Sequence, residues 1–157
     1  MKSENYSILF VCLGNICRSP LAEGIMKHIL NKKNINNIIV KSCGTESYHI
    51  GQKADKRAIM IGLKHNIDIT SHIASRFKHS YFNEFNKIYV MDNDVYEEVA
   101  KFSIDKKKME NVHFLMDVVF PNKKIEIPDP YYGGYDEFEK VFNMINIACE
   151  KLSLQLI

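Results

Sequence analysis

The sequence has no long apolar run, no excess charge of one sign and few cysteines. Its 157 residues carry 21 lysines and arginines against 19 aspartates and glutamates, a net charge of +2, so the overall field predicts neither a nucleic-acid nor a membrane partner. No stretch approaches the roughly 20 apolar residues that cross a bilayer. The polar segment Met1–Asn5 and the short apolar run after it do not fit a signal peptide. We therefore expect a cytoplasmic protein.

The cysteines and histidines form no framework of their own. In a cytoplasmic chain Cys12, Cys17, Cys43 and Cys149 are expected to be thiols and not disulfides. No histidine–cysteine cluster has metal-ligand spacing, so we expect no metal and no other cofactor. Neither a repeat nor a linker divides the chain, and its length suits one domain with its own core. The sequence predicts a single domain over residues 1–157 and a monomer.

Apolar runs and helical periodicities alternate along the chain. Strands are predicted at 8–11, 38–42, 88–91 and 112–115, and helices at 19–31, from 55, from 92 and from 136. This order is typical of an α/β fold with a four-stranded parallel sheet and helices on both faces. Ligands of such sheets bind beyond the carboxyl ends of the strands. Residues that follow the first three strands should therefore meet at one rim: Cys12, Ser42–Thr45 and Asp92.

The segment between the first strand and the first helix begins at Cys12 and ends at Arg18. Successive backbone N–H groups in a tight turn form a concave anion site, and a helix N-terminus adds its positive dipole end. Gly14 and Asn15 are residue types that tolerate the left-handed backbone expected in such a loop. The Arg18 guanidinium can bind two phosphate oxygens at once. The loop is thus predicted to bind a phosphoryl group.

Cys12 is the candidate nucleophile under that phosphoryl group. The positive field of the loop favours its thiolate form, which is the reactive form of cysteine. The alternative is a buried strand-end cysteine, with Ser19 as an unrelated N-cap before Pro20. Cysteine followed by arginine six positions on and then by serine or threonine is expected about 0.006 times by chance in such a chain, which favours the phosphate interpretation.

Asp129 is the candidate general acid. A phosphotyrosine ester leaves as a phenolate whose conjugate acid has a pKa of about 10, so protonation of the leaving oxygen assists the reaction. Pro128 and Pro130 stiffen the chain around the carboxyl group, and Tyr131 and Tyr132 can flank a phenyl ring. A rigid surface turn before a helix explains the same residues equally well.

Together these residues resemble the low-molecular-weight protein tyrosine phosphatases over nearly the whole chain. The resemblance implies hydrolysis of phosphotyrosine proteins or small aryl phosphates through a cysteinyl-phosphate, with Cys12, Arg18 and Asp129 as catalytic residues and inorganic phosphate as product and inhibitor. The matching segments are the loop with Pro20–Glu23, 42–45, 55–58, 70–72, 91–92 and 129–133.

The resemblance also implies further site residues. The substrate-binding set is Leu13, Gly14, Asn15, Ile16, Cys17, Ser19, Tyr48, His49, Tyr131 and Tyr132. Ser19 is expected to donate to the thiolate besides capping the helix. The network that braces the loop comprises Asn15, Ser42, His72 and Asp92. From the residues alone, His72 is an ordinary polar loop residue and Asp92 a helix cap.

The resemblance also raises points of regulation and of rival function. Cys17 is expected to form a protective disulfide with Cys12, against the alternative of a small buried loop residue, and Tyr131 and Tyr132 are phosphorylated in some family members. Cys43 replaces a smaller residue, and the family often has tryptophan in place of Tyr48, so substrate preference does not carry over. An arsenate reductase of this fold needs further cysteines, and 73–92 has none. A non-catalytic anion-binding module would not need the intact catalytic residues.

Overall fold

The computed structural model describes residues 5–156 and contains one parallel sheet. Its strand order is β2-β1-β3-β4, and every neighbouring pair is parallel, which confirms the predicted sheet. The prediction that Met1–Asn5 is not part of a signal peptide rests mainly on residues 1–4, which lie outside the described residues. The strand ends differ from the prediction by at most two residues: β1 spans Tyr6–Cys12, β2 Ile38–Gly44, β3 Lys87–Val90 and β4 Val112–Phe114.

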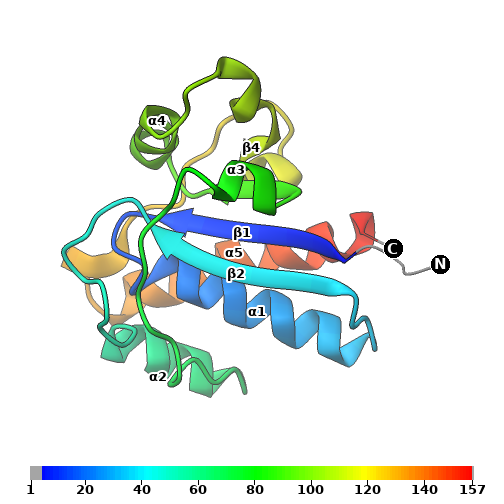
Figure 1. Cartoon of the computed structure of the whole chain (residues 1–157). Coiled ribbons are helices and arrows are strands. Elements are labelled where there is room, and N and C mark those ends of the chain that lie inside the picture. Colours follow the sequence, from blue (N-terminus) through cyan, green and yellow to red (C-terminus); the bar gives the residue numbers. More distant parts are fainter. Residues whose placement is uncertain (1–4, 157) are drawn as a thin grey trace.

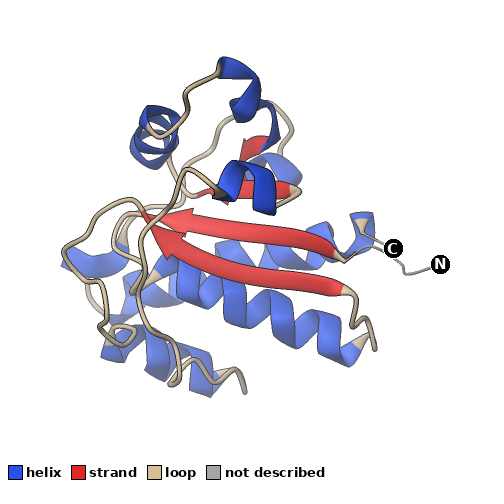
Figure 2. Ribbon diagram, in the orientation of Figure 1, coloured by secondary structure: helices blue, strands red, loops and turns tan. Residues whose placement is uncertain are grey.

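Helices cover both faces of the sheet (Figures 1 and 2). One face carries α1 (Arg18–Lys32), α2 (Lys56–Lys64) and α5 (Tyr135–Gln155), and the other carries α3 (Tyr81–Glu84) and α4 (Asn93–Lys101). No helix within residues 5–156 has the length and apolarity to cross a membrane. Four short helical turns have too few residues to show a periodicity, so the sequence does not predict them: α3, η1 (Lys106–Asn111), η2 (Leu115–Val118) and η3 (Pro130–Tyr132).

Strand β1 divides its side chains between two hydrophobic cores. Successive strand residues point to opposite faces. Ile8, Phe10 and Cys12 therefore belong to the core beneath α1, α2 and α5, whereas Leu9 and Val11 pack with α3 and α4. The nucleophile candidate is thus the last residue of a central strand, where it pairs with Gly44 of β2.

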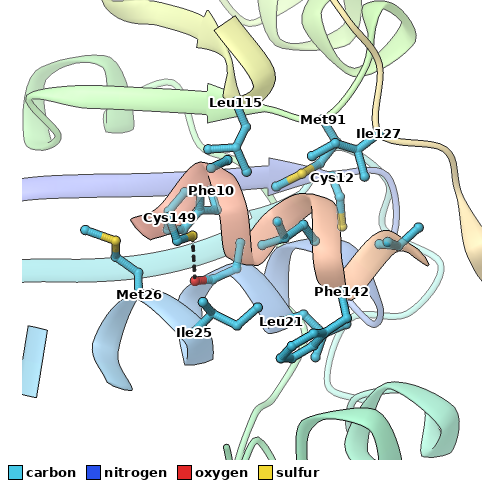
Figure 3. Packing of buried hydrophobic residues seen from close by; sticks show 14 of the residues in the cluster. Phe10, Cys12, Leu21, Ile25, Met26, Met91, Leu115, Ile127, Phe142 and Cys149 are labelled. Carbon is cyan, nitrogen blue, oxygen red and sulfur yellow. Dashed lines mark hydrogen bonds between the residues drawn. The ribbon is translucent and has the colours of Figure 1, made fainter. Parts of the chain in front are cut away.

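Cys149 and Cys43 are core residues. Figure 3 shows Cys149 of α5 within the larger core, where its thiol donates to the backbone oxygen of Ala22 at 3.9 Å. Cys43 is fully buried in the smaller core. Burial raises the pKa of both thiols, so both stay protonated and unreactive.

The predicted N-cap of the first helix is wrong. Helix α1 begins at Arg18, and its N-cap residue, Cys17, makes no side-chain capping bond. Ser19 lies inside the helix and its hydroxyl contacts Cys12 instead of a backbone N–H. By contrast, Asp55 and Asp92 do cap α2 and α4, since each carboxylate accepts a backbone N–H of its helix at 2.8 Å.

Candidate active site

A cavity of about 450 Å³ opens at the carboxyl ends of the strands, as the topology predicts. Predicted site residues that do not line it are Asn15, Ser19, Ser42, His72 and Asp92. The lining comes from the nucleophile loop (residues 12–18), the segment 46–49 and the acid loop (residues 128–134): Cys12, Leu13, Gly14, Ile16, Cys17, Arg18, Glu46, Tyr48, His49, Asp129, Tyr131 and Tyr132.

Asn15 organises the nucleophile loop from behind the cavity. Its backbone is left-handed, with φ of 58°, and its side chain is fully buried. The side-chain oxygen accepts the backbone N–H of Ser75 at 3.0 Å. The amide nitrogen therefore faces the hydroxyls of Ser19, at 2.7 Å, and Ser42, at 3.1 Å. The backbone N–H of Asn15 also donates to Cys12 Sγ at 3.3 Å.

The Ser19 hydroxyl is directed at the sulfur of Cys12. Its oxygen accepts from Asn15, so its single hydrogen is available to donate. Cys12 Sγ lies 2.8 Å away, whereas the alternative acceptor, the carbonyl of Cys43, lies 3.3 Å away. The sulfur thus faces two donors, the hydroxyl of Ser19 and the backbone N–H of Asn15.

Further side chains hold this network in place. His72 Nε2 donates to the backbone oxygen of Asn15 at 2.8 Å, because a carbonyl can only accept. The Ser42 hydroxyl donates to Glu23 at 2.7 Å. The sequence predicts no role for Glu23, although it stands four residues after Ser19 on the same face of α1, a spacing that indicates a shared neighbourhood.

Arg18 is 2% exposed, and its guanidinium is hydrogen-bonded through Nη1. Its Nη1 donates to Asp92 at 2.6 Å and to the carbonyl of Ile127 at 2.8 Å, while Nη2 lies 3.7 Å from Asp129 Oδ2. Burial acts to lower the pKa of Arg18, but the charges of Cys12 and Asp92 outweigh it and raise the pKa. Asp92 is both a helix cap and a partner of Arg18, because one carboxylate oxygen caps α4 and the other binds the guanidinium.

Asp129 caps the helical turn η3 in the acid loop. Its Oδ1 accepts the backbone N–H of Tyr131 at 3.0 Å, and about a third of its side chain is exposed. The sequence predicts no role for Arg57, yet this residue donates to the carbonyls of Tyr131 and Gly133. The Asp-x-Arg helix start is the one local sign of Arg57, and it does not reveal a contact some 75 residues away.

Aromatic rings border the cavity mouth. Tyr48 and His49 meet edge to face with centroids 4.9 Å apart, and His49 lies 6.1 Å from Tyr131. The left-handed backbone expected in the nucleophile loop is confirmed at Asn15, but it is wrong for Gly14. A Cβ at Gly14 would lie 2.9 Å from His49 Cδ2, so a side chain there would require the His49 ring to shift.

Cys17 lines the cavity beside Cys12, and both are free thiols. Burial raises the pKa of Cys17, and the negative charges of Asp55, Cys12 and Asp129 raise it further. Its disulfide with Cys12 stays a prediction. Among the described residues, no group of three or more histidine, cysteine, aspartate or glutamate side chains is placed to bind a metal ion.

Comparison with known proteins agrees with this geometry. The sequence model of the family "Low molecular weight phosphotyrosine protein phosphatase" matches residues 7–157. The chain belongs to this phosphatase family. The low molecular weight phosphotyrosine protein phosphatase 1 of Drosophila melanogaster is 37% identical over 143 residues, covering 90% of this chain and 91% of that protein. The Homo sapiens phosphatase is 35% identical over 144 residues, covering 91% and 90%.

Solved phosphatase structures share the fold. The protein tyrosine phosphatase from Entamoeba histolytica, crystallised with Hepes in its active site, is 38% identical, with a TM-score of 0.89 and 96% of each chain covered. YfkJ from Bacillus subtilis is 30% identical, with a TM-score of 0.90 and 99% and 97% covered. The predicted family, fold and enzyme class are confirmed: the chain is a protein tyrosine phosphatase of low molecular weight.

Proposed function

We propose that Cys12, Arg18 and Asp129 carry out the phosphatase reaction through a cysteinyl-phosphate. The observation that carries this assignment is their place on one cavity, where Arg18 Nη2 lies 3.7 Å from Asp129 Oδ2. A thiolate, a fixed cation and a carboxyl group are the three groups that transfer of an aryl phosphate requires.

In the first step the Cys12 thiolate attacks phosphorus and the bond to the aryl oxygen breaks. Asp92 and Ile127 hold Arg18 by Nη1, so its Nε and Nη2 side binds two phosphoryl oxygens. Backbone N–H groups of the nucleophile loop bind the oxygens from the other side, apart from that of Asn15, which donates to Cys12. Asp129 gives its proton to the leaving oxygen, and the products are a phenol and a phosphorylated Cys12.

In the second step a water molecule attacks phosphorus and the S–P bond breaks. Asp129, now a carboxylate, takes a proton from this water. The Cys12 sulfur leaves as a thiolate, which the N–H of Asn15 and the hydroxyl of Ser19 stabilise. Inorganic phosphate departs, and we expect it to inhibit the enzyme by binding to Arg18 and the nucleophile loop in place of the substrate.

The substrates we propose are phosphotyrosine in proteins and small aryl phosphates. Tyr48, His49, Tyr131 and Tyr132 border the cavity, and aromatic side chains of this kind pack well against a phenyl ring. The buried network of Asn15, Ser42, His72 and Asp92 is proposed to preorganise the loop and Arg18.

We further propose that the chain acts as a single-domain monomer in the cytoplasm. The four free thiols fit a reducing compartment, and the near-neutral net charge fits the absence of a nucleic-acid or membrane partner. Light scattering at micromolar concentration tests the oligomeric state directly.

The catalytic assignment is tested with two aryl phosphates that differ in leaving group. Asp129→Ala should lower kcat/KM for phenyl phosphate by about 100-fold or more, and much less for p-nitrophenyl phosphate, because only the poorer leaving group depends on protonation. Cys12→Ser should abolish turnover of both substrates and still bind inorganic phosphate.

The matched control is Asp136→Ala, which removes an exposed carboxylate from the nearby first turn of α5. It should leave both values of kcat/KM unchanged. Equal losses on both substrates in Asp129→Ala would remove Asp129 as the acid, and turnover by Cys12→Ser would remove Cys12 as the nucleophile.

A further inference from the structure

We propose that Arg57 is a positioning residue for the reaction, which holds the acid loop where Asp129 can protonate the leaving group. This inference rests on the proposed role of Asp129 as general acid. Arg57 stands at the start of α2 and does not line the cavity. It acts through the backbone of the acid loop, which carries Asp129.

Arg57 donates to two carbonyls of the acid loop. Its Nη2 binds the oxygen of Tyr131 and its Nη1 the oxygen of Gly133, both at 2.9 Å. The backbone N–H of Tyr131 in turn binds Asp129 Oδ1 at 3.0 Å. Tyr131 therefore connects Arg57 to the acid, and a shift at its carbonyl moves the carboxyl group of Asp129.

The guanidinium is itself anchored to the nucleophile loop. Arg57 donates from Nε and Nη2 to the two carboxylate oxygens of Asp55, at 3.0 and 2.9 Å. The backbone N–H of Asp55 donates to the carbonyl of Ile16 at 2.8 Å. A continuous path of hydrogen bonds thus fixes the acid loop relative to the loop that carries Cys12.

Aromatic packing sets the plane of the guanidinium. Its central carbon lies 4.6 Å from the ring centroid of Phe138, a fully buried residue of α5, and 5.7 Å from that of Tyr131. The planar fork serves the carboxylate and both carbonyls at once. A lysine ammonium has neither the plane nor the fork to do so.

The acid loop has little other attachment of this kind. Among the described residues, its other hydrogen bonds run within the loop, such as Gly133 N–H to Pro130, or into the first turn of α5. Asp129 and Tyr132 are exposed. Without Arg57 the loop keeps its local turn but loses its hydrogen bonds to α2.

The test compares Arg57→Gln and Arg57→Lys with the parent enzyme on phenyl phosphate and p-nitrophenyl phosphate. Both variants should lose about tenfold in kcat/KM for phenyl phosphate, since a misplaced acid fails mainly where protonation is needed. For p-nitrophenyl phosphate we expect less than about a threefold loss. Inhibition by inorganic phosphate should be unchanged, because the nucleophile loop keeps its own bonds.

A double variant shows whether Arg57 acts through Asp129. When Asp129 is already alanine, adding Arg57→Gln should lower kcat/KM for phenyl phosphate no more than it lowers kcat/KM for p-nitrophenyl phosphate. Lys64→Gln is the control: it breaks the 2.8 Å ion pair between α2 and Glu139 of α5 and leaves the acid loop untouched. Its two kcat/KM values should equal those of the parent.

Equal losses on the two substrates, or a full extra selective loss in the double variant, would overturn the positioning role of Arg57. If Asp129→Ala itself shows no dependence on the leaving group, the proposed acid fails first. The two failures are therefore distinguishable.

Discussion

The nucleophile loop and the acid loop meet at one cavity but are held in opposite ways. Asn15 of the nucleophile loop and Ser19, which follows the loop, are fully buried and hydrogen-bonded to each other behind the cavity. In the acid loop Asp129 is partly exposed, Tyr132 is 92% exposed, and Arg57 supplies the contact from α2. One segment is part of the core, and the other lies on the surface.

This difference follows from the chemistry of each segment. Groups that stabilise a thiolate and a phosphoryl group act most strongly when they are preorganised and shielded from water. The acid must instead meet a leaving oxygen that belongs to a substrate entering from solvent. Damage to the nucleophile loop should therefore affect both stability and catalysis, whereas damage to the acid loop should affect catalysis alone.

The largest expected effect comes from a methyl group placed against the nucleophile loop. A Cβ at Gly44 would lie 2.6 Å from the carbonyl oxygen of Leu13 and 3.0 Å from Asn15 N, so backbone must move. Gly44→Ala should lower kcat/KM about 100-fold, the cost of displacing a reacting group by about 1 Å. Gly134→Ala at the acid loop meets nothing within 4 Å and should change kcat/KM less than about twofold. Equal activity of the two variants would contradict the comparison.

A smaller effect is expected on folding stability. Asn15→Gly keeps the left-handed backbone but leaves the N–H of Ser75 and the two serine hydroxyls without their partner. The free energy of unfolding in urea should fall by about 2 kcal/mol. Asp129→Asn should change it by less than about 0.5 kcal/mol. An acid-loop variant as destabilised as Asn15→Gly would show that both segments belong to the core.

The smallest effect concerns Asp55, which connects the two loops. Burial acts to raise its pKa, but the hydrogen bonds and charge of Arg57 outweigh burial and hold the pKa below its usual range. The ionised carboxylate therefore stabilises the fold above the unfolded-state pKa of about 3.9, and this contribution is lost as pH falls through the lower pKa of the folded state. The stability difference between the parent enzyme and Asp55→Asn should narrow from about pH 5 towards pH 2, as measured by urea unfolding.

Arg57→Gln provides the control for that pH dependence. With the guanidinium gone, Asp55→Asn should change the slope of stability against pH less, because only the backbone N–H groups that Asp55 caps still lower its pKa. Parallel curves for the parent enzyme and Asp55→Asn over the whole range would show that Asp55 contributes no pH-dependent stability.

Local pattern was sufficient to predict the strands and to propose the chemistry of residues 12–18. The continuous apolar run of β1 and the helix caps at Asp55 and Asp92 depend on near neighbours, so the sequence alone predicts them. The two wrong local predictions, Ser19 as N-cap and Gly14 as left-handed, share one cause. Each residue type has several uses, and the partners that select among them, Cys12 and His49, are set by the fold.

The sequence by itself determined a parallel α/β sheet and led to the proposal of a cysteine nucleophile in an anion-binding loop, because both depend on residues close together in the chain. The tertiary structure decided which side chains brace that loop and which one holds the acid. Glu23 reaches Ser42, and Arg57 reaches the carbonyls of Tyr131 and Gly133. A bond to a distant backbone carbonyl requires no particular residue type at the accepting position, so it leaves no pattern in the sequence.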